Sequence, residues 1–184
     1  MRWLACILLL CTLSVRAEER VMVCFNYGCL AQAEVVYGDE QLRQLGLILG
    51  QAHDAAQERV AIGIAVGRLL DWAGKQSPIF ADRGGNYADD GVYGKMDCID
   101  HSTTTTRLLH LMDRRGLLRY HRVLEPVVRR SFLIFEHYTA LIEEVEQAGG
   151  RRYVVDSWFF DNGQPAVVMP LAQWRAGESP NVGE

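Results

Sequence analysis

The chain has 184 residues, of which 19 are basic and 23 acidic, so its formal net charge is −4. This acidic balance argues against nucleic acid or an anionic membrane surface as the main partner, because both bind through clustered Lys and Arg. After residue 17, no segment approaches the roughly 20 apolar residues of a membrane-spanning helix, so no integral span is predicted for the mature chain.

Residues 1–17 have the pattern of a secretory signal peptide. Arg2 provides a basic start, the apolar run from Trp3 to Leu13 is too short to span a bilayer comfortably, and a small-x-small sequence ends at Ala17. We therefore expect cleavage after Ala17 and a periplasmic or secreted protein. The remaining length, residues 18–184, suits a single globular domain.

Three cysteines remain after this cleavage, namely Cys24, Cys29 and Cys98. Cys24 and Cys29 bracket a stretch with Asn and Gly that can reverse tightly, which makes a disulfide between them sterically plausible in an oxidising compartment. Cys98 is then left over, and an odd cysteine in an exported protein indicates either intermolecular pairing or a reactive thiol. A buried small hydrophobe is the structural alternative, but the neighbouring Asp97 and Asp100 make a purely apolar niche hard to build.

Two helices are predicted in the first half of the chain, over residues 40–52 and 54–74. Each begins after a polar start signal and carries apolar residues at helical spacing. Gly63 and Gly67 lie one turn apart in the second helix, which predicts close packing against another element. We expect that element to be the helix that follows Cys98.

The stretch from Lys75 to Lys95 is rich in Gly, Asp, Asn and Tyr. It lacks the alternating oxygen ligands, closed by a glutamate, that a calcium loop requires. A surface loop that forms one wall of a cleft is therefore predicted. Asn86, within this loop, is a candidate oxyanion donor.

Cys98 falls at the N-terminus of a third predicted helix, which Gly116 ends. Unpaired N–H groups and the positive end of the helix dipole favour an anion there, which stabilises the thiolate form of a cysteine. The neighbouring carboxylates of Asp97 and Asp100 oppose this effect by like-charge interaction. The Cys98 N–H is itself the default oxyanion donor.

An antiparallel meander is predicted for the rest of the chain. Helices that precede an antiparallel meander are typical of an α+β protein, and residues 171–174 are expected to close the fold. The predicted extended segments are 117–128, broken at Pro126, then 137–145, 152–160 and 166–169, with turns at 149–150 and 161–163.

Nucleophilic catalysis by cysteine needs a base within hydrogen-bond reach and a third group that fixes the tautomer of the base. His137 opens one predicted strand, and Asp156 lies in the next. Pairing of these strands would place both residues at the same end of the sheet, facing Cys98. Taken singly, His137 also fits a strand histidine bonded to a carbonyl, and Asp156 fits a cap of the 161–163 turn or a partner of Arg151 or Arg152.

This arrangement resembles the transglutaminase-like cysteine proteins, within the broader papain-like group. The resemblance spans about residues 94–160 and rests on Cys98 at a helix start, Gly116 at the helix end, His137 opening a strand, and the segment Tyr153–Trp158. It implies a transglutaminase-like fold with a Cys98, His137 and Asp156 triad. The activity it implies is that of a cysteine peptidase, an amidase or an acyltransferase that acts on a peptide, protein or peptidoglycan amide and needs no cofactor.

Two other classes of function stay open. A non-catalytic periplasmic binding module, a pseudoenzyme on the same fold, would account for the acidic residues that flank Cys98. A metal site built from Cys98, His101, His137 and an aspartate is the third class, because Cys98 and His101 have a helical spacing that suits zinc. No second compact ligand pair exists in the sequence, so no metal is expected.

Overall fold

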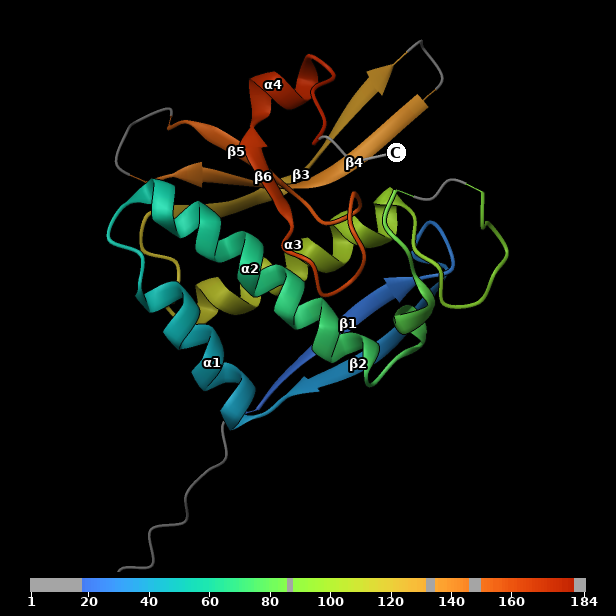
Figure 1. The fold of residues 1–184 in the computed structure, drawn as a ribbon, viewed down its shortest axis with the longest axis horizontal. Coiled ribbons are helices and arrows are strands. Elements are labelled where there is room, and N and C mark those ends of the chain that lie inside the picture. Colours follow the sequence, from blue (N-terminus) through green and yellow to red (C-terminus); the bar gives the residue numbers. More distant parts are fainter. Residues whose placement is uncertain (1–17, 86–87, 132–134, 146–149, 181–184) are drawn as a thin grey trace, which may run out of the picture.

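A computed structural model describes residues 18–85, 88–131, 135–145 and 150–180 (Figure 1). The predicted signal peptide, residues 1–17, lies outside these ranges. Within them, no helix combines the length and apolarity needed to cross a bilayer. In chain order the elements are β1 (Glu19–Phe25), β2 (Ala31–Tyr37), α1 (Asp39–Gly50), α2 (Ala55–Gly74), the short 3₁₀ helix η1 (Pro78–Ala81), α3 (Cys98–Arg114), β3 (His121–Ser131), β4 (Phe135–Glu144), β5 (Arg152–Asp156), β6 (Val167–Pro170) and α4 (Leu171–Arg175).

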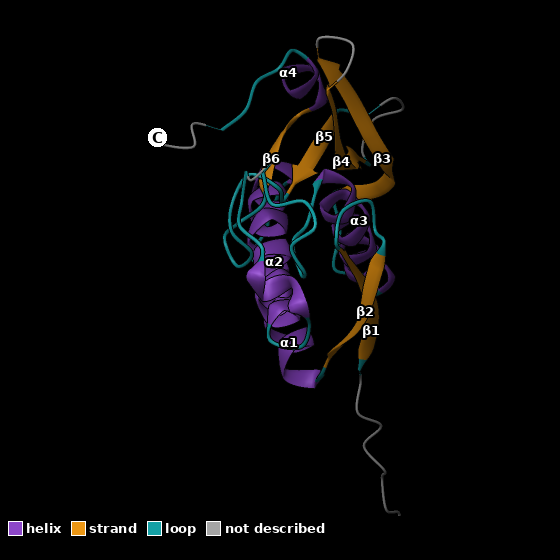
Figure 2. Cartoon of the chain, turned by 90° about the vertical axis from the view of Figure 1, so that its right-hand side faces the viewer, coloured by secondary structure: helices purple, strands orange, loops and turns teal. Residues whose placement is uncertain are grey.

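The described residues form an α+β arrangement with two antiparallel sheets. One is the β1–β2 hairpin, and the other has the strand order β3-β4-β5-β6. Helix α3 packs against both β1 and β4, so it joins the two sheets, while α1 and α2 pack together in a layer that faces α3 and the hairpin (Figure 2). A continuous apolar core includes residues from both sheets and from α1, α2 and α3.

The prediction that helices come first was wrong, because the β1–β2 hairpin precedes them. Val21 and Val23 are buried, whereas Met22 between them is 40% exposed, so β1 has the alternation of a half-buried strand. The buried face is covered by α3, which lies some 80 residues further along the chain, as the 2.9 Å bond from Cys24 N–H to Thr104 Oγ1 shows.

Two predicted strand boundaries also differ from the structure. Pro126 does not break β3, because a bulge between Leu124 and Val127 takes up the proline, which has no N–H to donate. Strand β5 ends at Asp156, not at residue 160. The Asp156 carboxylate accepts the N–H of Trp158 at 3.2 Å and turns the chain out of the sheet. A loop over 157–166, longer than the predicted tight turn, then leads to β6.

Gly63 and Gly67 do mark a close approach, but not to α3 as predicted. A Cβ on Gly63 would lie 2.7 Å from the carbonyl oxygen of Ala166, and one on Gly67 would lie 2.2 Å from that of Gln164. The Ala166 N–H also donates to the Gly63 carbonyl at 3.0 Å. These glycines therefore allow residues 164–166, which lead into β6, to pack directly against the backbone of α2.

We expect Gly67→Ala to destabilise the protein by about 1–3 kcal/mol, because the clash is with backbone that cannot rotate away. Gly46→Ala in α1 is the matched control. A Cβ at Gly46 meets nothing within 4 Å, so this change should stabilise the protein by roughly 0.5–1 kcal/mol. Urea unfolding of the two variants measures both effects, and equal shifts would contradict the assigned contact.

Candidate active site

Cys98 is the first residue of α3, as predicted, and is a partly exposed free thiol. Asp97 caps the helix. Its carboxylate accepts the Asp100 N–H at 2.8 Å, and the Asp100 carboxylate accepts the Asp97 N–H at 3.1 Å. This reciprocal capping box holds the turn that carries the thiol. The Cys98 N–H lies in the first helical turn, where no intrahelical acceptor exists, so it suits the predicted role of oxyanion donor.

His137 and Asp156 are brought together by the pairing of β4 with β5. His137 Nε2 lies 2.7 Å from Asp156 Oδ2, and the two side chains are 12% and 1% exposed. Trp174 Nε1–H donates to the same carboxylate at 3.1 Å. The rings of Trp158, Phe159 and Trp174 surround the imidazole at centroid distances of 5.1, 5.6 and 5.7 Å. The orientation of His137 is therefore fixed by one carboxylate and three aromatic side chains.

The Cys98 Sγ lies 3.8 Å from the carbonyl oxygen of Glu136, the residue that directly precedes His137. Because Nε2 is taken by Asp156, Nδ1 is the ring nitrogen left for the thiol. Burial acts to lower the pKa of His137, but the bonds to Asp156 and Cys98 outweigh it and raise the pKa to about 9. His137 therefore holds a proton at neutral pH.

Asp156 caps the turn at Trp158, not the 161–163 turn, and the two arginines considered as its partners pair elsewhere. Arg151 instead pairs with Glu144 at 2.9 Å, and Arg152 pairs with Glu143 at 2.9 Å. His137 likewise bonds to a carboxylate where a backbone carbonyl was the alternative. The structure thus pairs His137 with Asp156 and brings the Cys98 thiol to the backbone of Glu136, next to His137.

The predicted disulfide between Cys24 and Cys29 is confirmed. It closes a left-handed turn over residues 26–29, in which four consecutive residues have positive φ. The φ values are 66° at Asn26, 63° at Tyr27, 64° at Gly28 and 58° at Cys29. Only glycine adopts this region without steric cost, so the turn needs a constraint, which the disulfide supplies.

The left-handed turn binds the carboxylates on either side of Cys98. Successive N–H groups in such a turn point into one concavity that suits an anion. Tyr27 and Cys29 donate their N–H groups to Asp100 at 2.8 and 2.7 Å, and Gly28 donates to Asp97 at 3.0 Å. The negative charge expected to oppose a Cys98 thiolate is thus directed into the turn. Burial raises the pKa of Asp100 to about 6, against the effect of these N–H groups.

The metal alternative is not supported at His101. Both of its ring nitrogens are occupied, Nδ1 by Ser157 Oγ at 2.9 Å and Nε2 by Asp82 Oδ2 at 3.0 Å. Among the described residues, the metal-ligand grouping that the geometry allows is Cys24, Cys29 and Asp100. Its two sulfurs are consumed by the disulfide, so they are not free to bind a metal as thiolates.

Several contacts of the site were not anticipated from sequence. The Trp174 indole reaches Asp156 from 18 residues away, and nothing in the pattern around Trp174 indicates it. The buried bonds of His101 were also missed, although a histidine one turn after Cys98 could have prompted the question. The candidate oxyanion donor Asn86 lies outside the described residues.

No family model, curated protein or solved structure matches this chain.

Proposed function

We propose that this protein is an exported, thiol-dependent acyl-transfer enzyme with a transglutaminase-like fold. Cys98 is the nucleophile, His137 is the base and then the acid, and Asp156 orients the imidazole. The observation that carries the proposal is that His137 bonds to Asp156 at 2.7 Å while the Cys98 thiol lies 3.8 Å from the backbone of the adjacent Glu136. The substrate class is an amide of a peptide, a protein or peptidoglycan, and the enzyme is a cysteine peptidase or amidase.

In the proposed resting state the Cys98 thiol proton already resides on His137, whose pKa is about 9, so the reaction begins from a thiolate and an imidazolium. The sulfur attacks the carbonyl carbon, a C–S bond forms, and the C=O π electrons move to oxygen, where the Cys98 N–H can stabilise the charge. Collapse of this intermediate breaks the C–N bond, and the imidazolium gives its proton to the departing amine. The acyl group is left on Cys98 as a thioester.

Water completes hydrolysis in a second step. Neutral His137 takes a proton from the water, whose oxygen attacks the thioester carbonyl and releases the acid and the Cys98 thiolate. An amine in place of water would make the protein an acyltransferase. The high pKa of His137, about 9, suits the first step best, since an imidazolium is the acid that the leaving amine requires.

Iodoacetamide tests the thiol and imidazole pair without a substrate. A free thiol with the ordinary pKa of about 8.5 is only a few per cent thiolate at pH 7. We expect wild-type Cys98 to alkylate at pH 7 about tenfold faster than such a free thiol. The alkylation rate should rise again near pH 9, where His137 loses its proton. His137→Ala should remove the fast alkylation at pH 7 and leave one rise in rate with pH, that of an ordinary thiol.

Mass spectrometry supplies the control. Alkylation of the mature protein without reduction should add one adduct, and Cys98→Ala should add none. A wild-type profile identical to that of His137→Ala would contradict the proposed pair. The protein would then be better described as the non-catalytic binding module.

A further inference from the structure

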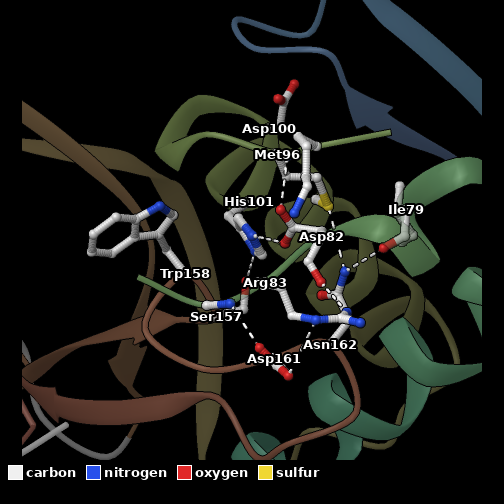
Figure 3. A network of polar contacts seen from close by, with 12 residues as sticks. Ile79, Asp82, Arg83, Met96, Asp100, His101, Ser157, Trp158, Asp161 and Asn162 are labelled. Carbon is white, nitrogen blue, oxygen red and sulfur yellow. Dashed lines mark hydrogen bonds and ion pairs between the residues drawn. The ribbon is translucent and has the colours of Figure 1, made fainter. Parts of the chain in front are cut away.

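The buried His101, in α3 one turn after Cys98, lies at the centre of a hydrogen-bond chain. Figure 3 shows its ring between Asp82 and Ser157, which approach it from a loop and from the end of β5. The side chains of His101 and Asp82 are 2% and 1% exposed. Thr105, one helical turn after His101 in α3, extends the chain with a 2.8 Å contact between its Oγ1 and Ser157 Oγ.

One assignment of protons satisfies every member of this chain. The Asp82 carboxylate can only accept, so His101 Nε2–H donates to it. Nδ1 of a neutral imidazole then accepts the Ser157 hydroxyl proton, and the Thr105 hydroxyl donates to the Ser157 oxygen. A fully paired buried chain of this kind holds its members in one geometry, because any displacement leaves a buried polar group unpaired.

The two ends of the chain are attached to the two halves of the proposed active site. Asp82 Oδ1 accepts the N–H of Met96 at 2.9 Å, two residues before Cys98. At the other end, Ser157 directly follows Asp156 and lies inside the turn that the Asp156 carboxylate makes with Trp158 N–H. His101 therefore connects the segment that leads into Cys98 with the turn that contains the Asp156 carboxylate.

We propose that His101, acting through Asp82 and Ser157, is a positioning residue that sets the placement of Cys98 relative to His137 and Asp156. This inference rests on the proposed function, since it concerns the same reaction. Apolar side chains could fill the same buried volume at no cost in unpaired polar groups. What the polar chain supplies is a directional link between two elements that must meet with an accuracy well below 1 Å.

The test measures Cys98 alkylation by iodoacetamide in the full mature chain, as a function of pH. Ser157→Ala removes the hydroxyl that bonds to His101 Nδ1. His101→Gln removes the same bond but keeps a side-chain N–H that can donate to Asp82. Both should lower the rate at pH 7 about tenfold and shift the rise near pH 9 to lower pH, because a displaced thiol or carboxylate no longer holds the His137 proton.

Thr106→Val is the matched control. Thr106 is also buried in α3, but its hydroxyl donates to the Ser102 carbonyl at 2.8 Å, outside the chain. Its rate at pH 7 should stay within about twofold of wild type although a buried hydrogen bond is lost. If Ser157→Ala fails to fold, His101→Gln carries the comparison by itself.

The outcomes separate this inference from the proposed function. A fast, His137-dependent wild type with folded Ser157→Ala and His101→Gln variants of unchanged rate and profile would overturn the positioning role alone. A wild type whose rate does not depend on His137 would overturn the proposed function and, with it, this inference. Loss of rate in both variants but not in Thr106→Val supports the positioning role.

Discussion

Replacing Asp156 with alanine is expected to lower the pKa of His137 from about 9 by roughly 1–3 units, the usual effect of removing an adjacent opposite charge. Burial then acts with little opposition, since only the Cys98 contact still favours the protonated ring. The protonated fraction of the imidazole at physiological pH falls accordingly, and the fast alkylation of Cys98 at pH 7 should slow with it. NMR titration of the histidine rings measures the pKa directly, with His137→Gln identifying the resonance.

The same substitution should reduce stability. Asp156 is buried and accepts from His137, Trp174 and Trp158, so its removal leaves three donors without their acceptor. We expect a loss of about 3–5 kcal/mol, the cost of breaking a buried pair from one side. Asp113→Ala, at an exposed position on α3, is the control and should stay within about 0.5 kcal/mol of wild type.

The stability of the wild type should also depend on pH through His137. Its folded-state pKa of about 9 lies above the ordinary value, so the protonated form contributes stability that is fully present below pH 6.5. That contribution is lost as pH rises from about 6.5 through 9, by up to roughly 3 kcal/mol. Asp156→Asn keeps the shape of the carboxylate without its charge and should flatten this dependence. An equally steep dependence in Asp156→Asn would show that Asp156 does not hold the His137 proton.

Removing the disulfide by the double change Cys24→Ser and Cys29→Ser should release the left-handed turn over residues 26–29. Closing so short a loop accounts for roughly 2 kcal/mol of stability on the chain-entropy model. Each non-glycine residue with positive φ costs about 1–3 kcal/mol of backbone strain. Without the disulfide, opening of the turn relieves this strain. Once the turn opens, Asp97 and Asp100 lose their three N–H donors.

Hydrogen exchange is the sharpest measurement of this effect. The amides of Tyr27, Gly28 and Cys29 should lose protection by tenfold or more in the double variant, because each is bonded to a carboxylate at the start of α3. The amide of Leu45, in α1 and fully buried, should keep its protection as an internal control. Unchanged exchange at residues 27–29 would mean that the carboxylates, and not the disulfide, hold the turn.

Cys98 alkylation should respond as well. With the turn open, the two carboxylates regain freedom beside the thiol, and like-charge interaction then disfavours the thiolate. A lower rate at pH 7 in the double variant, with Cys98 intact, would connect the disulfide to the reactivity of the site. A faster rate would contradict the role assigned to the turn.

Local features of the chain were readable from sequence. The start of α3 at Cys98 follows from Asp97 and Asp100, whose spacing is that of a capping box, and its end follows from Gly116. The disulfide was predictable because Cys24 and Cys29 lie close in sequence around turn-forming residues. The pairing of His137 with Asp156 was also within reach, because antiparallel strands joined by a short connection place such residues at one end.

Tertiary structure decided the contacts that join segments far apart in the chain. No local sequence pattern indicates three of these contacts. They are the packing of Gly63 and Gly67 against residues 164–166, the bond from the Trp174 indole to Asp156, and the bonds from His101 to Asp82 and Ser157. The direction of the Asp97 and Asp100 carboxylates is the clearest case. Sequence indicated only that they flank Cys98 and oppose a thiolate, whereas the fold aims them at N–H groups about 70 residues earlier. Charge effects depend on where a side chain points, and that is set by packing.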